Sequence, residues 1–208
     1  MDYTVTQVIH KNRNRWSDFK LTEISIDIHK PIILKAAKGN AKAQKKLYDL
    51  YAKAMFNICY RMMNNMHDAE DMLQEVFCEA FKRLESFRFE STFGAWIKRI
   101  TINKCINELK RKKISLELKE EFTPDSITDD YEDTENLQMS VNQIKHAMAL
   151  LPDGYRVIFS LYMLEGYDHQ EIAEIMNITV STSKSQLARA KKKLTDILKV
   201  GSIQYNLN

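Results

Sequence analysis

Apolar side chains recur at the spacing of an α-helix through the segment Asp68–Lys113, and this period limits the fold more than any other feature of the chain. In the first half of the segment they form one stripe, made of Leu73, Val76, Phe77, Ala80, Phe81 and Leu84. The full chain of 208 residues contains only five Gly and three Pro, so little in it would interrupt helices. These observations predict an all-α protein.

The same segment presents two helical faces of opposite charge. Opposite the apolar stripe lie the carboxylates of Asp68, Asp71, Glu75 and Glu79, and Asp68 stands where the helix needs an N-cap. After an aromatic loop, a second helix carries a polar, cationic face and ends in a run of four basic residues. This basic face consists of Arg99, Asn103, Asn107 and Lys110. A short module with one negative and one positive face suggests two different partners.

Charge is segregated along the chain, although the net charge is only +3. Residues 81–113 hold ten Lys and Arg against three Glu, and residues 114–138 hold nine Asp and Glu against one Lys. Residues 180–208 again favour the basic type, with six Lys and Arg against one Asp. Two basic blocks separated by an acidic one suggest two nucleic-acid contacts joined by a linker. Any one of these runs, taken alone, is explained as readily by a solvated surface.

The helical pattern divides the chain into two small helical domains. Four helices are expected between Pro31 and Lys113, enough for an independent core. The stretch that follows is acidic, contains Pro124 and lacks a clear period, so we interpret it as a linker. The predicted boundaries are 1–29 for an N-terminal arm, 30–113 for the first domain, 114–138 for the linker, 139–199 for the second domain and 200–208 for a tail.

A short helix, a tight turn and a longer basic helix predict a helix-turn-helix near the C-terminus. Asp168 and Glu171 form a capping-box pattern, Asn177–Thr179 makes the turn, and the longer helix is expected from Val180 to about Leu198. Leucines on its apolar side would hold this helix to the body. The side chains left to face a DNA major groove are Ser181, Thr182, Lys184, Ser185 and Arg189. The alternative is an amphipathic helix hairpin whose basic face is merely solvated.

Aromatic and cationic side chains are interleaved around the loop that precedes the basic helix of the first domain. The aromatic residues are Phe87, Phe89, Phe93 and Trp96, and the polar or cationic ones are Arg88, Ser91, Lys98 and Arg99. Unstacked bases pack on aromatic rings while cations follow phosphates, so this loop suits single-stranded nucleic acid. Phe93 and Trp96 could equally close the core. We expect Trp96 to be at least partly buried and Phe89 to be the most exposed.

No complete catalytic or cofactor-binding constellation is present in the sequence. His67, Glu70, Asp71 and Glu75 have helical spacing, but the paired Glu-x-x-His motifs and further carboxylates of a di-iron bundle are missing. The chain also lacks a glycine-rich phosphate loop. We therefore expect neither an enzyme nor a bound metal or cofactor.

Cysteine usage and hydropathy indicate a reducing, aqueous environment. Cys59, Cys78 and Cys105 are far apart, odd in number and without CxxC spacing, so buried free thiols are expected. No apolar run approaches 18 residues, and the N-terminus lacks a signal-peptide pattern. We expect a soluble, cytoplasmic protein that does not insert into a membrane.

Three stretches, which fall in two blocks of the sequence, resemble the extracytoplasmic-function (ECF) group of bacterial sigma factors. DAEDMLQEVF resembles the region-two helix that binds the clamp helices of the polymerase beta-prime subunit. FRFESTFGAWIKRITINKCINELKRKK resembles the segment that captures a flipped base and the non-template strand of the minus-10 element. LEGYDHQEIAEIMNITVSTSKSQLARAKKKL resembles region four, which reads the minus-35 element as duplex DNA and binds the polymerase beta flap. The resemblance covers roughly residues 31–198.

The resemblance implies three sets of contact residues and shows three departures. The core-polymerase set is Asp68, Glu70, Asp71, Gln74, Glu75 and Phe77. The minus-10 set is Phe87, Arg88, Phe89, Ser91, Trp96, Lys98, Arg99 and Asn103. The minus-35 set is Ser181, Thr182, Lys184, Ser185, Gln186, Ala188 and Arg189. Ser183 stands where the family usually has an apolar residue, Gln186 where a basic one is common, and Phe89 where a small one is more frequent.

By this resemblance the chain is expected to be a sigma factor that binds core RNA polymerase and directs it to promoter DNA. The resemblance also implies regulation by an anti-sigma factor, which in this group is often membrane-anchored. The alternative is a helix-turn-helix regulator that acts without core polymerase. The acidic face and the aromatic, basic loop argue against that alternative, as does the absence of a dimerisation heptad.

Overall fold

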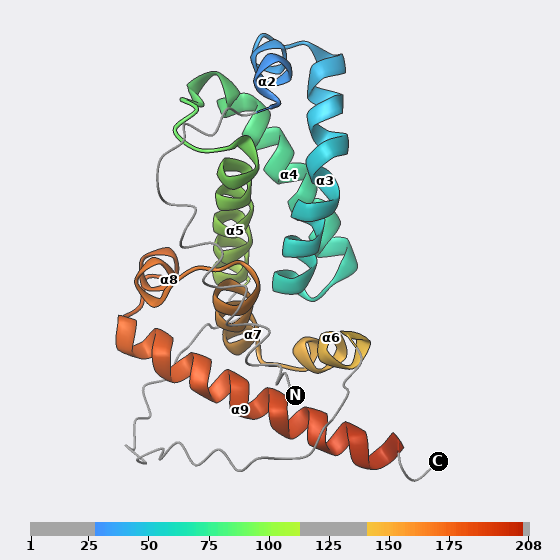
Figure 1. Cartoon of the computed structure of the whole chain (residues 1–208), viewed down its shortest axis with the longest axis vertical. Coiled ribbons are helices and arrows are strands. Elements are labelled where there is room, and N and C mark those ends of the chain that lie inside the picture. The colour runs from blue at the N-terminus through green and yellow to red at the C-terminus, as the bar shows by residue number, and fades with distance from the viewer. Residues whose placement is uncertain (1–27, 113–140, 206–208) are drawn as a thin grey trace, which may run out of the picture.

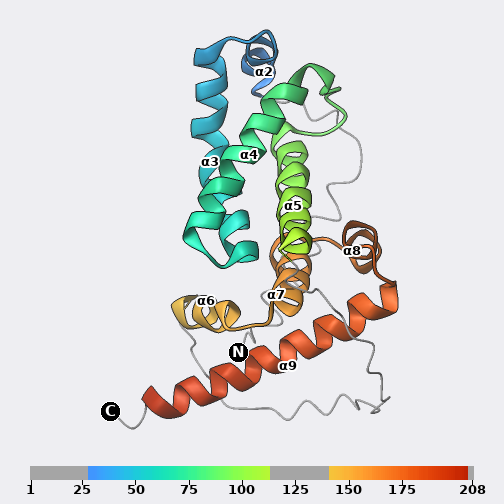
Figure 2. The same cartoon turned by 180° about the vertical axis from the view of Figure 1, so that it is seen from behind.

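The computed structural model describes residues 28–112 and 141–205, and every regular element in these ranges is a helix, which confirms the all-α prediction. One group comprises α2 (Lys30–Ala37), α3 (Ala41–Met63), α4 (Met66–Arg83) and α5 (Phe93–Arg111). The other comprises α6 (Val141–Ala149), α7 (Asp153–Phe159), α8 (His169–Met176) and α9 (Val180–Tyr205). Figures 1 and 2 show α9 crossing obliquely at the end of the molecule opposite α2. The predicted linker, 114–138, and most of the predicted arm lie outside the described residues, so these boundaries stay a prediction.

One glycine and two asparagines set the end of α2 and both ends of α3. Gly39, with a φ of +79° that suits glycine, follows α2, and the Asn40 side chain caps α3 by accepting a backbone N–H of its first turn. Asn64 ends α3 in the left-handed conformation, with a φ of 55°. These residues place the break between α2 and α3 at residues 38–40 and the end of α3 at Asn64.

The prediction that Asp68 caps α4 is wrong. The helix begins earlier, at Met66, and its N-cap is Asn65, whose side chain accepts the Asp68 backbone N–H at 3.0 Å. Asp68 instead lies in the first turn, where its carboxylate pairs with Lys112 at 2.6 Å. That contact joins the start of α4 to the end of α5, and the carboxylate still opposes the positive end of the helix dipole.

The first group encloses one apolar core. Its most deeply buried side chains include Leu47, Met62, Leu84, Phe93, Ile97, Ile102, Ile106 and Leu109. Cys59 and Cys105 are buried here as free thiols, and a hydrogen bond with Cys59, together with burial, raises the pKa of Cys105 well above its usual range. The expectation that all three cysteines are buried is wrong for Cys78, which is exposed on α4.

The second group is built on α9, against which α6, α7 and α8 all pack. α7 ends at Phe159 and continues as a wider π-helical turn over Ser160–Leu164. Gly166, with a φ of +79°, completes the break. At the other end α9 runs on to Tyr205, so part of the predicted tail 200–208 is helical.

The two groups touch through α3 and α7. Arg156 is only 4% exposed, and its guanidinium donates to the Leu151 carbonyl oxygen at 2.8 Å and to the Met62 carbonyl oxygen, at the end of α3, at 3.3 Å. The Asn64 side-chain amide donates to the Ala149 carbonyl oxygen at 2.9 Å. The two Arg156 hydrogen bonds are buried, and they keep the Leu151 and Met62 carbonyl groups satisfied.

Glu165 adds a charged contact between the same two groups. Its carboxylate, 10% exposed, pairs with Arg61 of α3 and lies 3.5 Å from the Lys98 ammonium of α5. Lys98 also donates to the Glu165 carbonyl oxygen at 3.1 Å. None of the helices among the described residues has both the length and the apolar character required to cross a bilayer.

Candidate nucleic-acid interface

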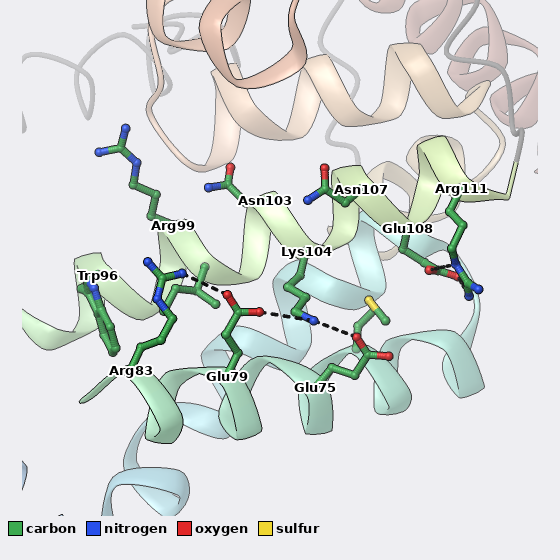
Figure 3. A pocket seen from close by; sticks show the side chains of 12 residues that line it. Glu75, Glu79, Arg83, Trp96, Arg99, Asn103, Lys104, Asn107, Glu108 and Arg111 are labelled. Atoms are coloured by element: carbon green, nitrogen blue, oxygen red, sulfur yellow. Dashed lines mark hydrogen bonds and ion pairs between the residues drawn. The ribbon is translucent and has the colours of Figure 1, made fainter. Parts of the chain in front are cut away.

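A groove of about 630 Å³ runs between α4 and α5, and Figure 3 shows the side chains that line it. On the floor, Lys104 reaches from α5 to Glu75 at 3.0 Å and to Glu79 at 3.3 Å, both on α4. Arg83 pairs with Glu79 at 3.0 Å and extends the series. We call these four side chains, Arg83, Glu79, Lys104 and Glu75, the α4–α5 ion-pair ladder.

The ladder shifts the pKa of two of its members. The hydrogen bond with Glu75 raises the pKa of Lys104; burial acts against that rise, and the bond with Glu79 adds to it. Burial acts to raise the pKa of Glu79, but hydrogen bonds from Arg83 and Lys104 together outweigh it and hold that pKa below its ordinary value. Both shifts favour the charged forms of Lys104 and Glu79, and the contacts of the ladder hold the acidic helix against the basic one.

The predicted core-polymerase set does not form one uniform surface. Glu70, Asp71 and Gln74 are exposed on α4. Asp68 and Glu75 face α5 and are engaged by Lys112 and Lys104, as described above. Phe77 is buried, and its ring packs against Tyr48 and Phe81 with centroids 4.7 and 5.7 Å apart. The structure therefore leaves Glu70, Asp71 and Gln74 as the exposed part of this set that is not paired with α5; within α4, the Asp71 carboxylate lies 3.6 Å from Nε2 of His67.

The basic helix α5 presents a polar side away from α4. Figure 3 shows Arg99, Asn103 and Asn107 pointing from α5 away from the acidic helix, while Lys104 points toward it. Arg99 and Asn103 are exposed, as the prediction requires of side chains that contact a ligand. Lys98 is half-buried because it reaches the Glu165 contact.

The aromatic loop before α5 is partly core and partly surface. Phe87 and Phe93 are buried, and Phe87 contacts Trp96 and Phe89 with centroid separations of 5.2 and 4.7 Å. Trp96 is half-buried, as expected. Phe89 is half-buried as well, with its ring on Phe87, and it is more exposed than Phe87 and Phe93. That it is also more exposed than Trp96 stays a prediction. Arg88 and Ser91 are exposed.

The helix-turn-helix has the local geometry that its sequence predicts. Asp168 and Glu171 form a complete capping box at the start of α8, and Asn177 turns the chain in the left-handed conformation with a φ of 58°. Thr179 starts α9 by accepting the Thr182 backbone N–H on its hydroxyl at 3.0 Å.

The predicted minus-35 residues divide by burial. Ser181, Lys184 and Ala188 are exposed, and Thr182, Ser185 and Arg189 are half-buried. Gln186 is only 5% exposed, so its side chain faces the interior and is not available to DNA in this arrangement. Ser183 is fully buried, and its hydroxyl lies 2.9 Å from Nδ1 of His169, so a polar contact joins α8 and α9 where the family usually has an apolar one.

Sequence reasoning missed the residues that tie these surfaces together. Lys104, Lys112 and Glu165 were absent from every predicted set, although each pairs with a predicted contact residue. Lys104 could have been found from its place on α5 opposite the acidic helix. Glu165 carries no local signal because its role depends on how the two groups pack. Within the described part of the chain, no three His, Cys, Asp or Glu side chains are placed to hold a metal ion.

The fold and the surfaces define a class of protein: an all-α nucleic-acid-binding protein with a helix-turn-helix, a basic helix beside an aromatic loop, and a separate acidic helix face. Comparison with known families narrows this class. The family model for Sigma-70 region 2 matches residues 47–114, and the model for Sigma-70, region 4 matches residues 141–194.

Relatives with assigned functions agree with these matches. The ECF RNA polymerase sigma factor SigW of Bacillus subtilis (strain 168) is 30% identical over 174 residues, which cover 78% of this chain and 92% of SigW. The ECF RNA polymerase sigma-E factor of Escherichia coli (strain K12) is 30% identical over 173 residues, which cover 78% of this chain and 90% of that protein. The chain belongs to the ECF RNA polymerase sigma factors, as its sequence predicted.

A solved structure supports the fold. The sigma factor RpoE, in a co-crystal structure with the anti-sigma factor NepR from Bartonella quintana, matches with a TM-score of 0.50 and 22% sequence identity. The match covers 75% of this chain and 96% of that one.

Proposed function

We propose that this sigma factor divides its work among three surfaces: exposed carboxylates of α4 for core polymerase, α5 with its preceding loop for opened promoter DNA, and α9 for duplex promoter DNA. The observation that carries the proposal is that one helical group holds an acidic helix, α4, and a basic helix, α5, side by side. The charges between the two helices are paired in the α4–α5 ladder. The exposed acidic groups that remain lie on α4, and the exposed basic and polar groups lie on α5.

For core polymerase, the proposed contacts are Glu70, Asp71 and Gln74. Their exposure supports this role, since a charged group already paired and partly buried contributes less to a new interface. By family resemblance the partners are the beta-prime clamp helices, with the beta flap bound by the second group of helices. Asp68 and Glu75 would act indirectly, by holding α4 against α5.

For the minus-10 element, we propose that Arg88, Phe89, Ser91 and Trp96 meet unstacked bases while Arg99 and Asn103 follow the strand. Bases that have left the duplex can stack on half-buried rings, and those contacts exist only after melting, so they favour the open state. Lys98 joins this set once it leaves Glu165. Phe87 is buried and supports the loop from below.

For the minus-35 element, the outward side chains of the first turns of α9 are the proposed readers. Ser181, Lys184 and Ala188 are exposed, and Arg189 is half-exposed one turn further on. Lys and Arg suit guanine or phosphate, and Ser suits several bases. Gln186 is left out because its side chain faces the interior.

The proposed partners also include an anti-sigma factor, which the related RpoE of known structure binds in its crystal. The proposed activity is binding and strand capture without covalent chemistry. Core polymerase and promoter DNA are found in the cytoplasm, so the chain would act there.

The polymerase surface is tested by reversing two exposed charges. We expect Glu70→Lys with Asp71→Lys to weaken binding to purified core polymerase at least tenfold, because two favourable contacts become repulsive. The matched control is Asp49→Lys with Glu85→Lys, two exposed carboxylates on other elements of the same helical group. The measurement is fluorescence anisotropy of the labelled chain titrated with core enzyme, with circular dichroism to check the fold. Equal affinity of the two double variants would refute the assignment of this surface.

A further inference from the structure

Lys30, at the start of α2, lies next to the aromatic loop although it precedes the residues that match Sigma-70 region 2. Its ammonium nitrogen lies 5.1 Å from the centroid of the Phe89 ring, over the ring. The two elements are held together because α2 packs against the short 3-10 turn Leu84–Ser86 from which the loop departs. Lys30 belongs to none of the contact sets described above.

Phe89 has an unusual backbone conformation. Its φ is +57°, in the left-handed region that β-carbon-bearing residues rarely adopt and where a bulky aromatic residue is strained. The surrounding structure retains this conformation: the ring rests against Phe87 at a centroid separation of 4.7 Å with the planes tilted by 52°. Backbone strain maintained by packing is typical of ligand-binding sites.

The surroundings of the ring suit a nucleotide. Exposed Lys30 and Arg88 supply two positive charges beside Phe89, against one exposed carboxylate, Glu90. An ammonium over an aromatic ring at an exposed site is worth roughly twofold to fivefold in an equilibrium constant. Stacking of a nucleic-acid base on an aromatic side chain is worth roughly fivefold to a hundredfold. A base can therefore displace the ammonium from the ring, and the flexible stem of lysine keeps the displaced charge within reach of the neighbouring phosphate.

We propose that Lys30 and Phe89 form one site for an unpaired base of the minus-10 strand, in which Phe89 stacks with the base and Lys30 binds the flanking phosphate. In the free protein Lys30 covers the ring that the base will occupy. This inference rests on the proposed function, because it adds a residue of α2 to the surface that holds opened promoter DNA.

The test measures the salt dependence of DNA binding by the holoenzyme. The probe is a forked DNA with a fluorescein-labelled single-stranded minus-10 region, selected from a random pool by the wild-type holoenzyme. We expect Lys30→Ala to weaken binding about threefold to tenfold and to lower the slope of log K against log salt by about 0.7, the value for one lost phosphate contact on a single strand. Lys30→Arg should restore both, and Lys35→Ala, an exposed lysine on the same helix, should change neither.

Each outcome has a distinct meaning. A Lys30→Ala holoenzyme that keeps the wild-type slope overturns the phosphate contact, even if its affinity falls. Phe89→Leu should weaken binding while retaining the wild-type slope of log K against log salt. In the Phe89→Leu variant, a second change, Lys30→Ala, should still lower that slope. If the double variant keeps the slope of Phe89→Leu, the shared site is overturned. If the wild-type holoenzyme selects no forked DNA at all, the proposed function fails, and the inference fails with it. Thermal unfolding of each variant shows whether the fold is intact.

Discussion

Lys98 is held by a group that would compete with DNA for it. Its ammonium lies 3.5 Å from the Glu165 carboxylate and 5.4 Å from the centroid of the Tyr167 ring, and Arg61 pairs with the same carboxylate. A DNA phosphate that binds Lys98 must replace Glu165. On the proposed assignment of Lys98 to DNA, the carboxylate would act as an internal anion that lowers the affinity of this face for DNA while the two helical groups are in contact.

Removal of the Glu165 charge should strengthen DNA binding by the chain alone. In Glu165→Gln, Arg61 and Lys98 lose their anionic partner, but both are about 30% exposed and water can solvate them, so the fold should survive. We expect the affinity for a short labelled single strand at low salt to rise about threefold to tenfold, since one more cation is available to the phosphates. Fluorescence anisotropy measures the change. Glu174→Gln, an exposed carboxylate of α8, is the control, and equal affinities for both variants would contradict the competition.

Burial is the property of the candidate-site residues that the sequence patterns predicted least well. Asn65 and Asp68 are both residue types that suit an N-cap; in the structure Asn65 caps α4 and Asp68 pairs with Lys112 of the neighbouring helix end. Phe77 and Gln186 stand at positions that the family resemblance assigns to partners, yet both side chains face the interior. Helical spacing predicts which residues share a face only to within about one residue. A residue at the edge of a predicted surface face can therefore have its side chain in the core.

The α4–α5 ladder is the feature that joins two helices of opposite charge, as Figure 3 shows. The pKa of Glu79 is held down in the folded protein by Arg83 and Lys104. Its stabilising effect is therefore present above the pKa of an unfolded glutamate, about 4.3, and is lost as the pH falls through the lower folded value. The pKa of Lys104 is raised in the folded protein, so its contribution to stability has the opposite pH dependence. That contribution is present below the pKa of an unfolded lysine, about 10.4, and is lost as the pH rises above it.

Glu79→Gln should therefore remove part of the acid sensitivity of the fold. At neutral pH we expect the variant to be less stable by up to about 1 kcal/mol, since the ladder is partly exposed to solvent. The difference from wild type should shrink toward zero as the pH is lowered below 4. Urea unfolding at a series of pH values measures it, with Glu85→Gln, an exposed residue, as the control. A difference that stays constant with pH would show that the Glu79 charge is not responsible.

Helices with strong end signals were predicted well, and those without them were not. The capping box at Asp168 and the left-handed turn at Asn177 placed α8 and the start of α9 correctly. The continuation of α9 to Tyr205 was missed because it includes Gly201, a weak helix former. The π-helical turn at Ser160–Leu164 was missed because its wider hydrogen bonds produce no separate pattern of apolar residues.

The contact between the two helical groups is a property that no local pattern could predict. It depends on the buried Arg156, which reaches the end of α3, on Asn64, which reaches Ala149, and on Glu165, which takes two cations from the other group. These residues come from the middle of α7, the end of α3 and the turn after the π-helical segment, which are far apart in the sequence. On the proposed function, reading two separate promoter elements would require this contact to open, because it occupies Lys98 of the proposed minus-10 surface.

Promoter-dependent run-off transcription with purified core polymerase is the most direct test of the account. We predict that adding this chain yields a discrete transcript from a promoter selected by the reconstituted holoenzyme, and that core polymerase alone yields none from it. Glu70→Lys with Asp71→Lys should abolish the transcript, and the control Asp49→Lys with Glu85→Lys should retain it. Absence of any stimulated transcript, together with sequence-specific DNA binding by the chain alone as a dimer, would contradict the account and favour a helix-turn-helix regulator that works without core polymerase.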